Sequence, residues 1–524
     1  MKRIRRALIS VSDKERLIPF VQGLRQMGVQ FISTGGTAKL LKEQEIPVKE
    51  IAEFTGSPEM LGGRVKTLHP KVHGGILARR EDRGHLNQVK KLGLELIDLV
   101  VVNLYPFEET AARRGASLSE LIERIDIGGV ALIRSAAKNF KSVGIVCRPS
   151  QYDPVLKELE KNGGRLTEAT RLKLAVEAFA ETGYYDSVIH QTLAHRTSPK
   201  RSAPDFPERI ILGASRRQIL RYGENPHQSG SWYQWPPISG RMEGWSGAKQ
   251  LHGKELSFNN LLDLDAALQL VSVFKKPSAV VVKHMNPCGA ACAGTLSAAF
   301  QRAFACDPLS AFGGIVGLNR PVDSRAAKAI HSAGFLECLI APGYKPDALK
   351  ILRTKKNLRI LQVPASAFRG SKRCMEIKQI AGGFLVQQPD DRLSGPIRWR
   401  LVTRFKPTAA QQKDLAFAWA VSKFVRSNAI VIAKGEQTVG IGAGQTSRVD
   451  SVLSAVKKAG PRARGAVLAS DGFFPKPDGP AFAVKAEVRA IVQPGGSIQD
   501  PEVIKVAQRA RIPMLLTGER HFRH

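Results

Sequence analysis

The chain has 524 residues and a net charge of +33, with 43% hydrophobic and 24% charged residues. This length exceeds a single hydrophobic core, so about two to four domains are expected, and the apolar runs are strand-sized, so no membrane span is expected. The charge permits nucleic acid, an acidic surface or anionic small molecules as partners. Because the excess is diffuse and no aromatic-interleaved motif accompanies it, a solvated basic surface is its simplest interpretation.

The cysteines and the first residues indicate the compartment. The cysteines have no framework spacing, so reduced thiols in a cytoplasmic protein are expected. The opening MKRIRRALISVSDK is basic, but its apolar stretch is short and soon reaches Asp13. We interpret it as a first strand and not as a signal peptide. The six cysteines stand at positions 147, 288, 292, 306, 338 and 374.

The N-terminal part alternates between apolar runs and helical patterns. Such alternation with short links predicts a parallel α/β sheet. The stretch 195–208, rich in Ser, Pro, Arg and Lys, is a candidate linker. Strands are predicted at 7–11, 29–33, 97–105 and 142–147, and helices at 14–27 and 34–43.

The C-terminal part carries further apolar runs, each followed by Gly or Pro and then a helical pattern. The segments KHMNPCGAA (283–291) and SNAIVIAKGEQTVGIGAG (427–444) are candidate counterparts in two related halves. The whole chain is therefore predicted to be α/β. Strands are predicted at 278–283, 312–318, 428–434, 466–470 and 489–494.

A glycine turn that opens a helix, STGGTAKLL, is a candidate phosphate cradle. Free N–H groups and the helix dipole favour an anion there, although plain turns share the pattern. The preceding strand ends with Ser12 and Lys14. Because ligands gather at the carboxyl ends of parallel strands, both loops are expected to line one crevice. The turn supplies Ser33, Thr34, Gly35, Gly36 and Thr37.

The stretch GGRVKTLHPKVHGGIL (62–77) concentrates cations among glycines. Arg64, Lys66 and Thr67 are interpreted as a cationic floor for an anionic substrate, in which a lysine shuttles a proton. A metal site from His69 and His73 is the alternative, but no nearby Cys or carboxylate completes it.

Two further segments, VVNLYPFEET and IDIGGVALIRSAAKNF, add polar groups after a strand and around a glycine turn. Taken alone, Asp126 is more typical of a helix cap than of a catalyst. Together with the glycine turn, the groups suffice for proton transfer during ring closure on a phosphorylated ligand. They are Asn103, Tyr105, Asp126, Gly128, Gly129 and Lys138.

These segments resemble the cyclohydrolase domain of a bifunctional purine-biosynthesis family. That family combines 5-aminoimidazole-4-carboxamide ribonucleotide (AICAR) transformylase with IMP cyclohydrolase. The match continues to the C-terminus, in order, through about a dozen motifs. They include RYGENPHQ (221–228), GKELSFNNLLDLDAA (253–267), VVKHMNPCGAA (281–291), CDPLSAFGGIV (306–316), ASDGFFP (469–475), IVQPGGSIQDPEVI (491–504) and the terminal RHFRH.

The resemblance implies a fold and a domain division. A doubly wound parallel-sheet domain, similar to methylglyoxal synthase, would span 1–196 and carry IMP cyclohydrolase. A larger domain of two cytidine-deaminase-like lobes would span 197–524 and carry AICAR transformylase. The implied co-substrate is 10-formyltetrahydrofolate, with no metal required.

The resemblance also implies partners. The ligands would be AICAR, formyl-AICAR, IMP and reduced folate. The protein would be a cytoplasmic homodimer whose transformylase sites are shared between subunits. We expect neither nucleic acid nor a membrane as a partner.

Lys283 and His284 are assigned to formyl transfer by this resemblance, and the chemistry asks for the same residue types. The AICAR amine is a poor nucleophile, so a base must accept its proton, and a neutral imidazole suits that work. The lysine would stabilise the oxyanion or protonate the leaving folate nitrogen. Asn428 would orient the carboxamide.

The remaining roles are carried over in the same way. In the cyclohydrolase site the catalytic residues would be Lys66, Tyr105, Asp126 and Lys138, with one lysine stabilising charge on the attacked formyl oxygen. Phe424 and Arg426 depart from the expected His and Lys. Other substrate-binding positions are Arg221, Tyr222, Phe312, Gly313, Glu337, Arg448, Phe473, Arg520 and His524.

Two alternatives come from other classes of protein. NPCGAAC resembles the P-C-x-x-C zinc motif of nucleobase deaminases, which also needs H-x-E. Cys288 and Cys292 are one residue too far apart, and LHGKE at 251–255 is H-x-x-E, so zinc is rejected. The non-enzyme alternative is a basic nucleic-acid-binding protein.

Overall fold

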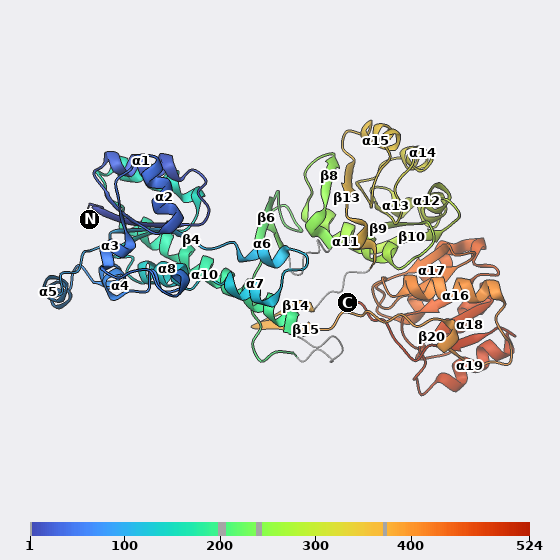
Figure 1. Ribbon diagram of the computed structural model, residues 1–524. Coiled ribbons are helices and arrows are strands. Elements are labelled where there is room, and N and C mark those ends of the chain that lie inside the picture. Colours follow the sequence, from blue (N-terminus) through green and yellow to red (C-terminus); the bar gives the residue numbers. More distant parts are fainter. Residues whose placement is uncertain (1–2, 198–205, 237–243, 370–374) are drawn as a thin grey trace. The chain divides into compact units, whose positions relative to one another are not determined.

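The computed structural model describes residues 3–197, 206–236, 244–369 and 375–524. It contains two compact units (Figure 1). The first comprises the chain up to Ser215, and the second comprises Arg216–Gln234 with most of the remaining chain to His524. Of the predicted linker at 195–208, residues 198–205 lie outside the described residues.

The first unit is built on a parallel sheet of five strands in the order β3-β2-β1-β4-β5. This order places the first strand in the centre and confirms the predicted doubly wound sheet. The strands are β1 (Arg6–Val11), β2 (Gln30–Ser33), β3 (Val48–Glu50), β4 (Leu99–Asn103) and β5 (Gly144–Val146).

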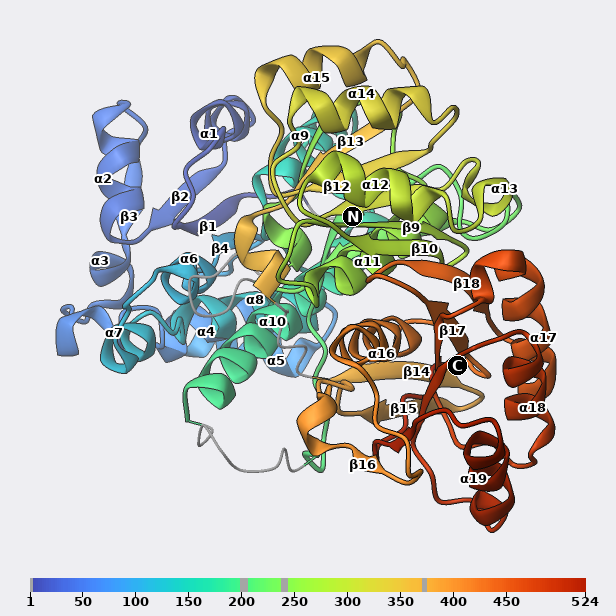
Figure 2. The same ribbon diagram turned by 90° about the vertical axis from the view of Figure 1, so that its right-hand side faces the viewer.

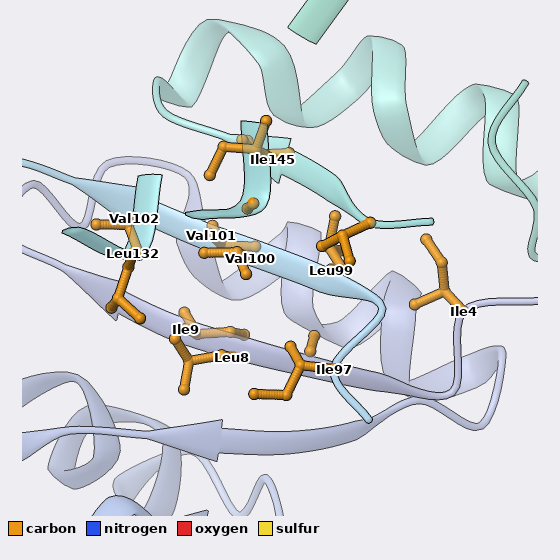
Figure 3. Packing of buried hydrophobic residues seen from close by; sticks show 14 of the residues in the cluster. Ile4, Leu8, Ile9, Ile97, Leu99, Val100, Val101, Val102, Leu132 and Ile145 are labelled. Atoms are coloured by element: carbon orange, nitrogen blue, oxygen red, sulfur yellow. The ribbon is translucent and has the colours of Figure 1, made fainter. Parts of the chain in front are cut away.

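Helices cover this sheet. Because its central strands are buried on both faces, they read as continuous apolar runs. Figure 3 shows Leu8 and Ile9 of β1 packed near Val100 and Val101 of β4, all four with no exposed surface. The helices are α1 (Leu17–Gln26), α2 (Gly35–Glu43), α3 (Ile51–Thr55), α4 (Pro70–Leu77), α5 (Arg83–Lys91), α6 (Phe107–Ala112), α7 (Leu118–Glu123), α8 (Gly128–Lys138), α9 (Tyr152–Lys161) and α10 (Glu168–Thr197), with 3₁₀ turns at Leu61–Gly63 and Pro149–Gln151.

The second unit contains two lobes, each with a six-stranded sheet (Figure 2). The first lobe has the order β10-β9-β11-β12-β13-β8. Its strands are β8 (Lys249–His252), β9 (Ser278–Lys283), β10 (Asn286–Cys292), β11 (Ile315–Leu318), β12 (Cys338–Ala341) and β13 (Arg359–Gln362). Its helices are α11 (Phe258–Ser272), α12 (Leu296–Phe304), α13 (Pro308–Ala311), α14 (Ser324–Ser332) and α15 (Pro346–Arg353).

The second lobe has the order β18-β17-β19-β20-β21-β16. Its strands are β16 (Arg400–Leu401), β17 (Ile430–Ala433), β18 (Thr438–Gly442), β19 (Val467–Ser470), β20 (Ala490–Gln493) and β21 (Met514–Leu516). Its helices are α16 (Ala409–Ser422), α17 (Arg448–Ala459), α18 (Asp478–Lys485) and α19 (Asp500–Arg509), with a 3₁₀ turn at Gly460–Ala463.

The two lobes repeat one topology. In each, an antiparallel hairpin (β9–β10 or β17–β18) starts the sheet, a parallel trio follows, and an antiparallel strand ends it. This repetition confirms the two related halves predicted from the strand exits. The lobes join where β10 meets β18, and there the Ala290 N–H donates to Thr438 Oγ1 at 2.9 Å.

Smaller elements complete the second unit. They are the hairpins β6 (Ser215–Leu220) with β7 (Gly230–Gln234) and β14 (Glu376–Ile380) with β15 (Gly383–Gln387), and the 3₁₀ turns Gly244–Gly247, Ala365–Arg369 and Pro396–Arg398. No helix in the described ranges is long and apolar enough to cross a membrane.

Candidate active sites

The loops after β1 and β2 lie together at the carboxyl edge of the first sheet. Ser10 Oγ and Thr34 Oγ1 are hydrogen-bonded at 2.8 Å. Helix α2 begins at Gly35, so its first N–H groups point out of this edge. A Cβ atom at Gly35 would lie 3.1 Å from Lys66 Nζ, and one at Gly36 would lie 3.5 Å from Lys14 Nζ. Free amides and two ammonium groups therefore converge on one spot that suits a phosphate.

Two of the predicted cradle residues have hydroxyls that are used inside the protein. Ser33 Oγ donates to the Ile9 carbonyl at 2.7 Å, and Thr37 Oγ1 donates to the Val11 carbonyl at 3.0 Å. Both side chains are buried. They fix the loop to β1 and leave Thr34 and the glycine amides to meet a ligand.

Asn103, at the end of β4, shapes the neighbouring loop. Its Oδ1 accepts from the N–H groups of Ser12 at 2.6 Å and Asp13 at 2.9 Å. Its Nδ2 donates to the Asp13 carbonyl at 2.9 Å. The side chain of Asn103, at the end of β4, thus fixes the backbone of Ser12 and Asp13, which follows the adjacent strand β1.

The start of α8 brings a carboxyl group and a hydroxyl to the same edge. Asp126 Oδ1 accepts from the Gly129 N–H at 2.7 Å, which is the cap that the sequence also suggested. Burial raises the pKa of Asp126, and the N–H groups of Gly129 and Tyr105 oppose that rise. A Cβ atom at Gly128 would lie 2.6 Å from Thr67 Oγ1, so only glycine allows this approach. A carboxyl with a raised pKa beside a hydroxyl suits proton transfer.

The predicted cations of this unit have different surroundings. Lys66 forms an ion pair with Glu59 at 2.8 Å and keeps 23% of its side chain exposed. Arg64 pairs with Glu123, and that hydrogen bond raises the pKa of Arg64. Lys138 is the last residue of α8, about 15 Å along the helix from its first residue. The structure therefore brings Lys14 and Lys66 to the crevice, and Lys138 lies at the opposite end of α8 from Gly128.

The histidines of the glycine-rich segment have separate partners. His69 caps α4, with Nδ1 accepting from the Lys71 N–H at 3.1 Å. His73 Nδ1 and Ser135 Oγ are 3.0 Å apart, and burial lowers the pKa of His73. In the sequence, His73 is singled out together with His69 as the alternative metal site. The partial burial of His73 and its contact with Ser135 arise from the fold, and no local sequence signal indicates them.

In the second unit, β9 ends at Lys283 and the chain turns at once. Lys283 Nζ donates to the Phe312 carbonyl at 2.9 Å. His284 and Met285 both have left-handed backbones, with φ of 52° and 61°. Asp263, on α11, accepts from both of their N–H groups. The turn thus leaves the His284 imidazole exposed beside a half-buried lysine.

Phe312 and Gly313 lie next to this lysine, where α13 leads into β11. Phe312 is 60% exposed, and its ring centroid lies 5.5 Å from that of Phe335. Gly313 has φ of 71°, and its N–H donates to the Phe335 carbonyl at 2.9 Å. Glu337 forms an ion pair with Arg359 at 2.8 Å. Its carboxylate therefore has a partner within the protein.

Arg448 and Asn428 form a unit in the second lobe. Arg448 Nη2 donates to Asn428 Oδ1 at 2.7 Å, and Asn428 Nδ2 donates to the Gln445 carbonyl at 2.9 Å. Arg448 also pairs with Asp471, and their side chains are 5% and 0% exposed. The structure satisfies the Arg448 charge internally and uses the guanidinium to orient the Asn428 amide.

A chain of hydrogen bonds joins this asparagine loop to the His284 turn. The Arg426 N–H donates to Asn286 Oδ1 at 3.0 Å, and Asn286 Nδ2 donates to the His284 carbonyl at 3.1 Å. Arg426 is one of the two departures from the family pattern. It therefore lies between the two candidate catalytic segments of the second unit.

The remaining predicted ligand-binding residues lie on exposed segments. Arg520 stands over the Phe522 ring at 4.6 Å, and Phe522 lies 5.9 Å from the His524 ring. Arg221 stands over the Tyr222 ring at 5.7 Å. Phe473 is 37% exposed.

The two cysteines of the rejected zinc motif belong to different cores. Cys288 packs in the cluster around Phe300, and Cys292 packs in the cluster around Trp419. Burial raises the pKa of Cys288 to about 12 and that of Cys292 to about 11. Among the described residues, no group of three His, Cys, Asp or Glu side chains is placed to hold a metal ion.

Together, the fold and the two sites define a two-unit α/β enzyme that acts on small phosphorylated molecules. Comparison with known proteins identifies the family. The model of the AICARFT/IMPCHase bienzyme family matches residues 136–458, and that of the MGS-like domain matches residues 16–131. The chain belongs to the AICARFT/IMPCHase bienzyme family, which confirms the predicted family and fold class.

Curated relatives named "Bifunctional purine biosynthesis protein PurH" match along the whole chain. The protein of Cyanothece sp. is 50% identical over 520 residues, covering 99% of each chain. That of Magnetococcus marinus is 49% identical over 535 residues, covering 100% of each. That of Listeria monocytogenes is 48% identical over 522 residues, covering 99% of this chain and 100% of the relative.

Proposed function

We propose that the second unit performs formyl transfer through Lys283 and His284, and that the first unit performs cyclisation in the crevice around Lys66. As a member of its family, the chain transfers a formyl group from 10-formyltetrahydrofolate to AICAR and cyclises formyl-AICAR to IMP. The observation that carries the assignment is the exposed His284 turn beside Lys283, on the face where Phe312 lies.

For formyl transfer, the AICAR amine attacks the formyl carbon. His284 accepts the proton that the amine loses, as a general base. Lys283 stabilises the oxyanion of the tetrahedral intermediate. When the carbon–nitrogen bond to the folate breaks, the leaving nitrogen takes a proton from Lys283 or His284. Asn428, oriented by Arg448, holds the carboxamide of AICAR.

The other second-unit residues supply binding. Aromatic and cationic side chains on exposed segments suit a ring and negative charges on two substrates. We assign this work to Arg221, Tyr222, Phe312, Phe473, Arg520 and His524. Gly313 and Glu337 stay in the proposal through family resemblance, since the Glu337 carboxylate is paired with Arg359.

For cyclisation, the carboxamide nitrogen of formyl-AICAR attacks the formyl carbon and water is lost. The cradle of Thr34 and the α2 amides holds the phosphate, and Lys66 stabilises charge on the attacked oxygen. Asp126 and Tyr105 move protons, because the raised pKa of Asp126 makes its carboxyl an effective donor and acceptor. Lys138 remains in this proposal through family resemblance alone.

We propose domain boundaries at 1–196 and 197–524. The first boundary falls at the end of α10. The compact first unit extends somewhat further, to Ser215.

The proposed oligomer is a homodimer in which a second copy completes the transformylase site. The second unit exposes apolar side chains that a monomer would leave in water: Ile397, Ile498 and Leu309 are 102%, 97% and 88% exposed. Apolar residues of the hairpin β14–β15, such as Leu385, are also exposed. Sedimentation velocity should give a dimer, and a fully active monomer would contradict this part of the proposal.

We also propose a cytoplasmic location with reduced thiols. The cysteines at 147, 288, 292, 306 and 338 are free and buried, and residue 374 lies outside the described residues. The metabolic role and the thiols fit a reducing compartment.

A spectroscopic assay of the purified chain with AICAR and 10-formyltetrahydrofolate tests the assignment, with supplied formyl-AICAR as a separate substrate for cyclisation. Salt-dependent DNA binding is measured in parallel. Turnover of both substrates is expected. Tight, sequence-independent DNA binding without turnover would overturn the proposal in favour of a basic nucleic-acid-binding protein.

A further inference from the structure

We propose that Asp263 is a positioning residue for formyl transfer: its carboxylate holds the left-handed turn that presents His284. The inference rests on the proposed role of Lys283 and His284. Asp263 lies inside α11, far from the turn in sequence, and it is absent from the predicted site.

The contact is specific for two consecutive backbone groups. Asp263 Oδ1 accepts from the Met285 N–H at 2.5 Å, and Oδ2 accepts from the His284 N–H at 3.2 Å. Both residues have positive φ, which is unfavourable for any residue with a Cβ atom. Burial raises the pKa of Asp263, and the two N–H groups oppose that rise. One half-buried carboxylate thus compensates for a strained turn.

The second lobe contains an independent copy of this arrangement. Asp414 on α16 accepts from the Gly435 N–H at 2.8 Å and the Glu436 N–H at 2.6 Å. These two residues also have positive φ, of 64° and 55°. The surrounding details repeat as well, since Lys434 Nζ donates to the Arg464 carbonyl at 3.0 Å as Lys283 does to Phe312.

The helices that carry the two aspartates are also matched. Helix α11 is capped by Ser257 and helix α16 by Thr408, each through a capping box with the side chain three residues later. Each aspartate follows its cap at the same interval. In both lobes, therefore, a helix carboxylate accepts from the two N–H groups that follow the lysine at the end of a strand, so this contact is a feature of the repeated fold.

The two turns differ in the residue that follows the lysine. In the second lobe it is Gly435, which adopts positive φ at little cost. In the first lobe it is His284, whose Cβ makes the same backbone unfavourable. The catalytic turn therefore depends more on its carboxylate than the other turn does. Without Asp263, the His284 backbone relaxes and the imidazole leaves its position relative to the AICAR amine.

Asp263→Asn is the test variant, and Asp414→Asn is the matched control. Asparagine keeps one acceptor oxygen and places an N–H₂ group against the second N–H. We expect kcat for formyl transfer to fall about 10- to 100-fold in D263N, since a base displaced by about 1 Å loses that much. KM for AICAR should stay within about twofold, because other residues hold the nucleotide. D414N should change kcat by less than about threefold, whatever its loss of thermal stability.

A double variant separates positioning from general structural damage. If Asp263 acts through His284, then D263N/H284A should be no slower than H284A alone, because the base is already absent. Losses that multiply in the double variant would overturn the inference. So would equal losses of kcat in D263N and D414N.

Two further measurements keep the test decisive. If D263N does not yield folded protein, Asp263→Glu replaces it, because glutamate retains the charge on a longer side chain. Its kcat for formyl transfer should lie between those of the wild type and H284A. Cyclisation of supplied formyl-AICAR should be unchanged in every variant. A normal rate in H284A would refute the proposed function, whereas a slow H284A with a normal D263N would refute only the role of Asp263.

Discussion

Two adjacent glycines at the start of α2 should respond in opposite ways to alanine. Gly35 has φ of 40°, and its Cβ would lie 3.1 Å from Lys66 Nζ. Gly36 has no positive φ, and its Cβ would lie 3.5 Å from Lys14 Nζ, which is ordinary contact. Gly35→Ala should therefore distort the phosphate cradle, and Gly36→Ala should fit into it.

The expected sizes follow from these two environments. A left-handed backbone costs a residue with a Cβ atom about 1–2 kcal/mol. If that cost falls on ligand binding, KM for formyl-AICAR should rise about 5- to 30-fold in G35A. If it falls on folding, the melting temperature should drop by about 2–8 °C for a unit of this size. G36A should be neutral or gain about 0.5 kcal/mol in unfolding free energy, since alanine favours a helix over glycine.

The assay is cyclisation of supplied formyl-AICAR, with formyl transfer as the internal control and calorimetry for stability. Transfer should be unchanged in both variants, because its proposed residues lie in the other unit. If G35A and G36A have the same cyclisation kinetics and the same melting temperature, the cradle geometry described for Thr34 and the α2 amides is refuted.

Three other predictions test individual groups. Lys66→Ala and Lys138→Ala are both expected to reduce cyclisation and spare transfer, with the larger loss in K66A because Lys66 Nζ lies beside Gly35 at the start of α2; normal cyclisation in both would remove the lysines from the mechanism. Burial raises the pKa of Asp126, so the wild type loses stability as pH rises through that pKa. The unfolding free energy of Asp126→Asn minus that of the wild type should therefore be larger at pH 7 than at pH 4. Urea titrations that give the same difference at both pH values would contradict this. Arg448→Met leaves Asp471 buried without its partner and should lower the unfolding free energy by about 3–5 kcal/mol; a loss under 1 kcal/mol would show that the pair is unimportant for stability.

The fold could be predicted where burial dominates. Strand β9 runs over the predicted residues 278–283, because an apolar run buried on both faces leaves little choice of structure. The first helix was predicted at 14–27 but begins at Leu17. The residues before it are held by Asn103 from β4, and such a long-range contact has no local signal in the sequence.

The sequence predicts which segments form the site, but not which side chains form ion pairs or hydrogen bonds with one another there. The motifs led to Lys283, His284 and Asn428, but nothing local shows that Glu337 pairs with Arg359 or that Arg448 neutralises Asp471. Asp263 stands in a quoted motif, and yet its role comes from a contact 21 residues away along the chain. Local sequence patterns carry no signal for side-chain partners that only tertiary packing brings together.

In the proposed function, the strand-exit pair Lys283 and His284 carries formyl transfer. The most direct measurement compares both half-reactions in purified His284→Ala and Lys283→Met, with folding checked by circular dichroism. Formyl transfer should fall by roughly two to four orders of magnitude in H284A, the usual contribution of general acid–base catalysis, with a similar loss in K283M. Cyclisation of supplied formyl-AICAR should proceed at the wild-type rate in both. Transfer at a near wild-type rate in H284A would show that the pair is structural and would contradict the account.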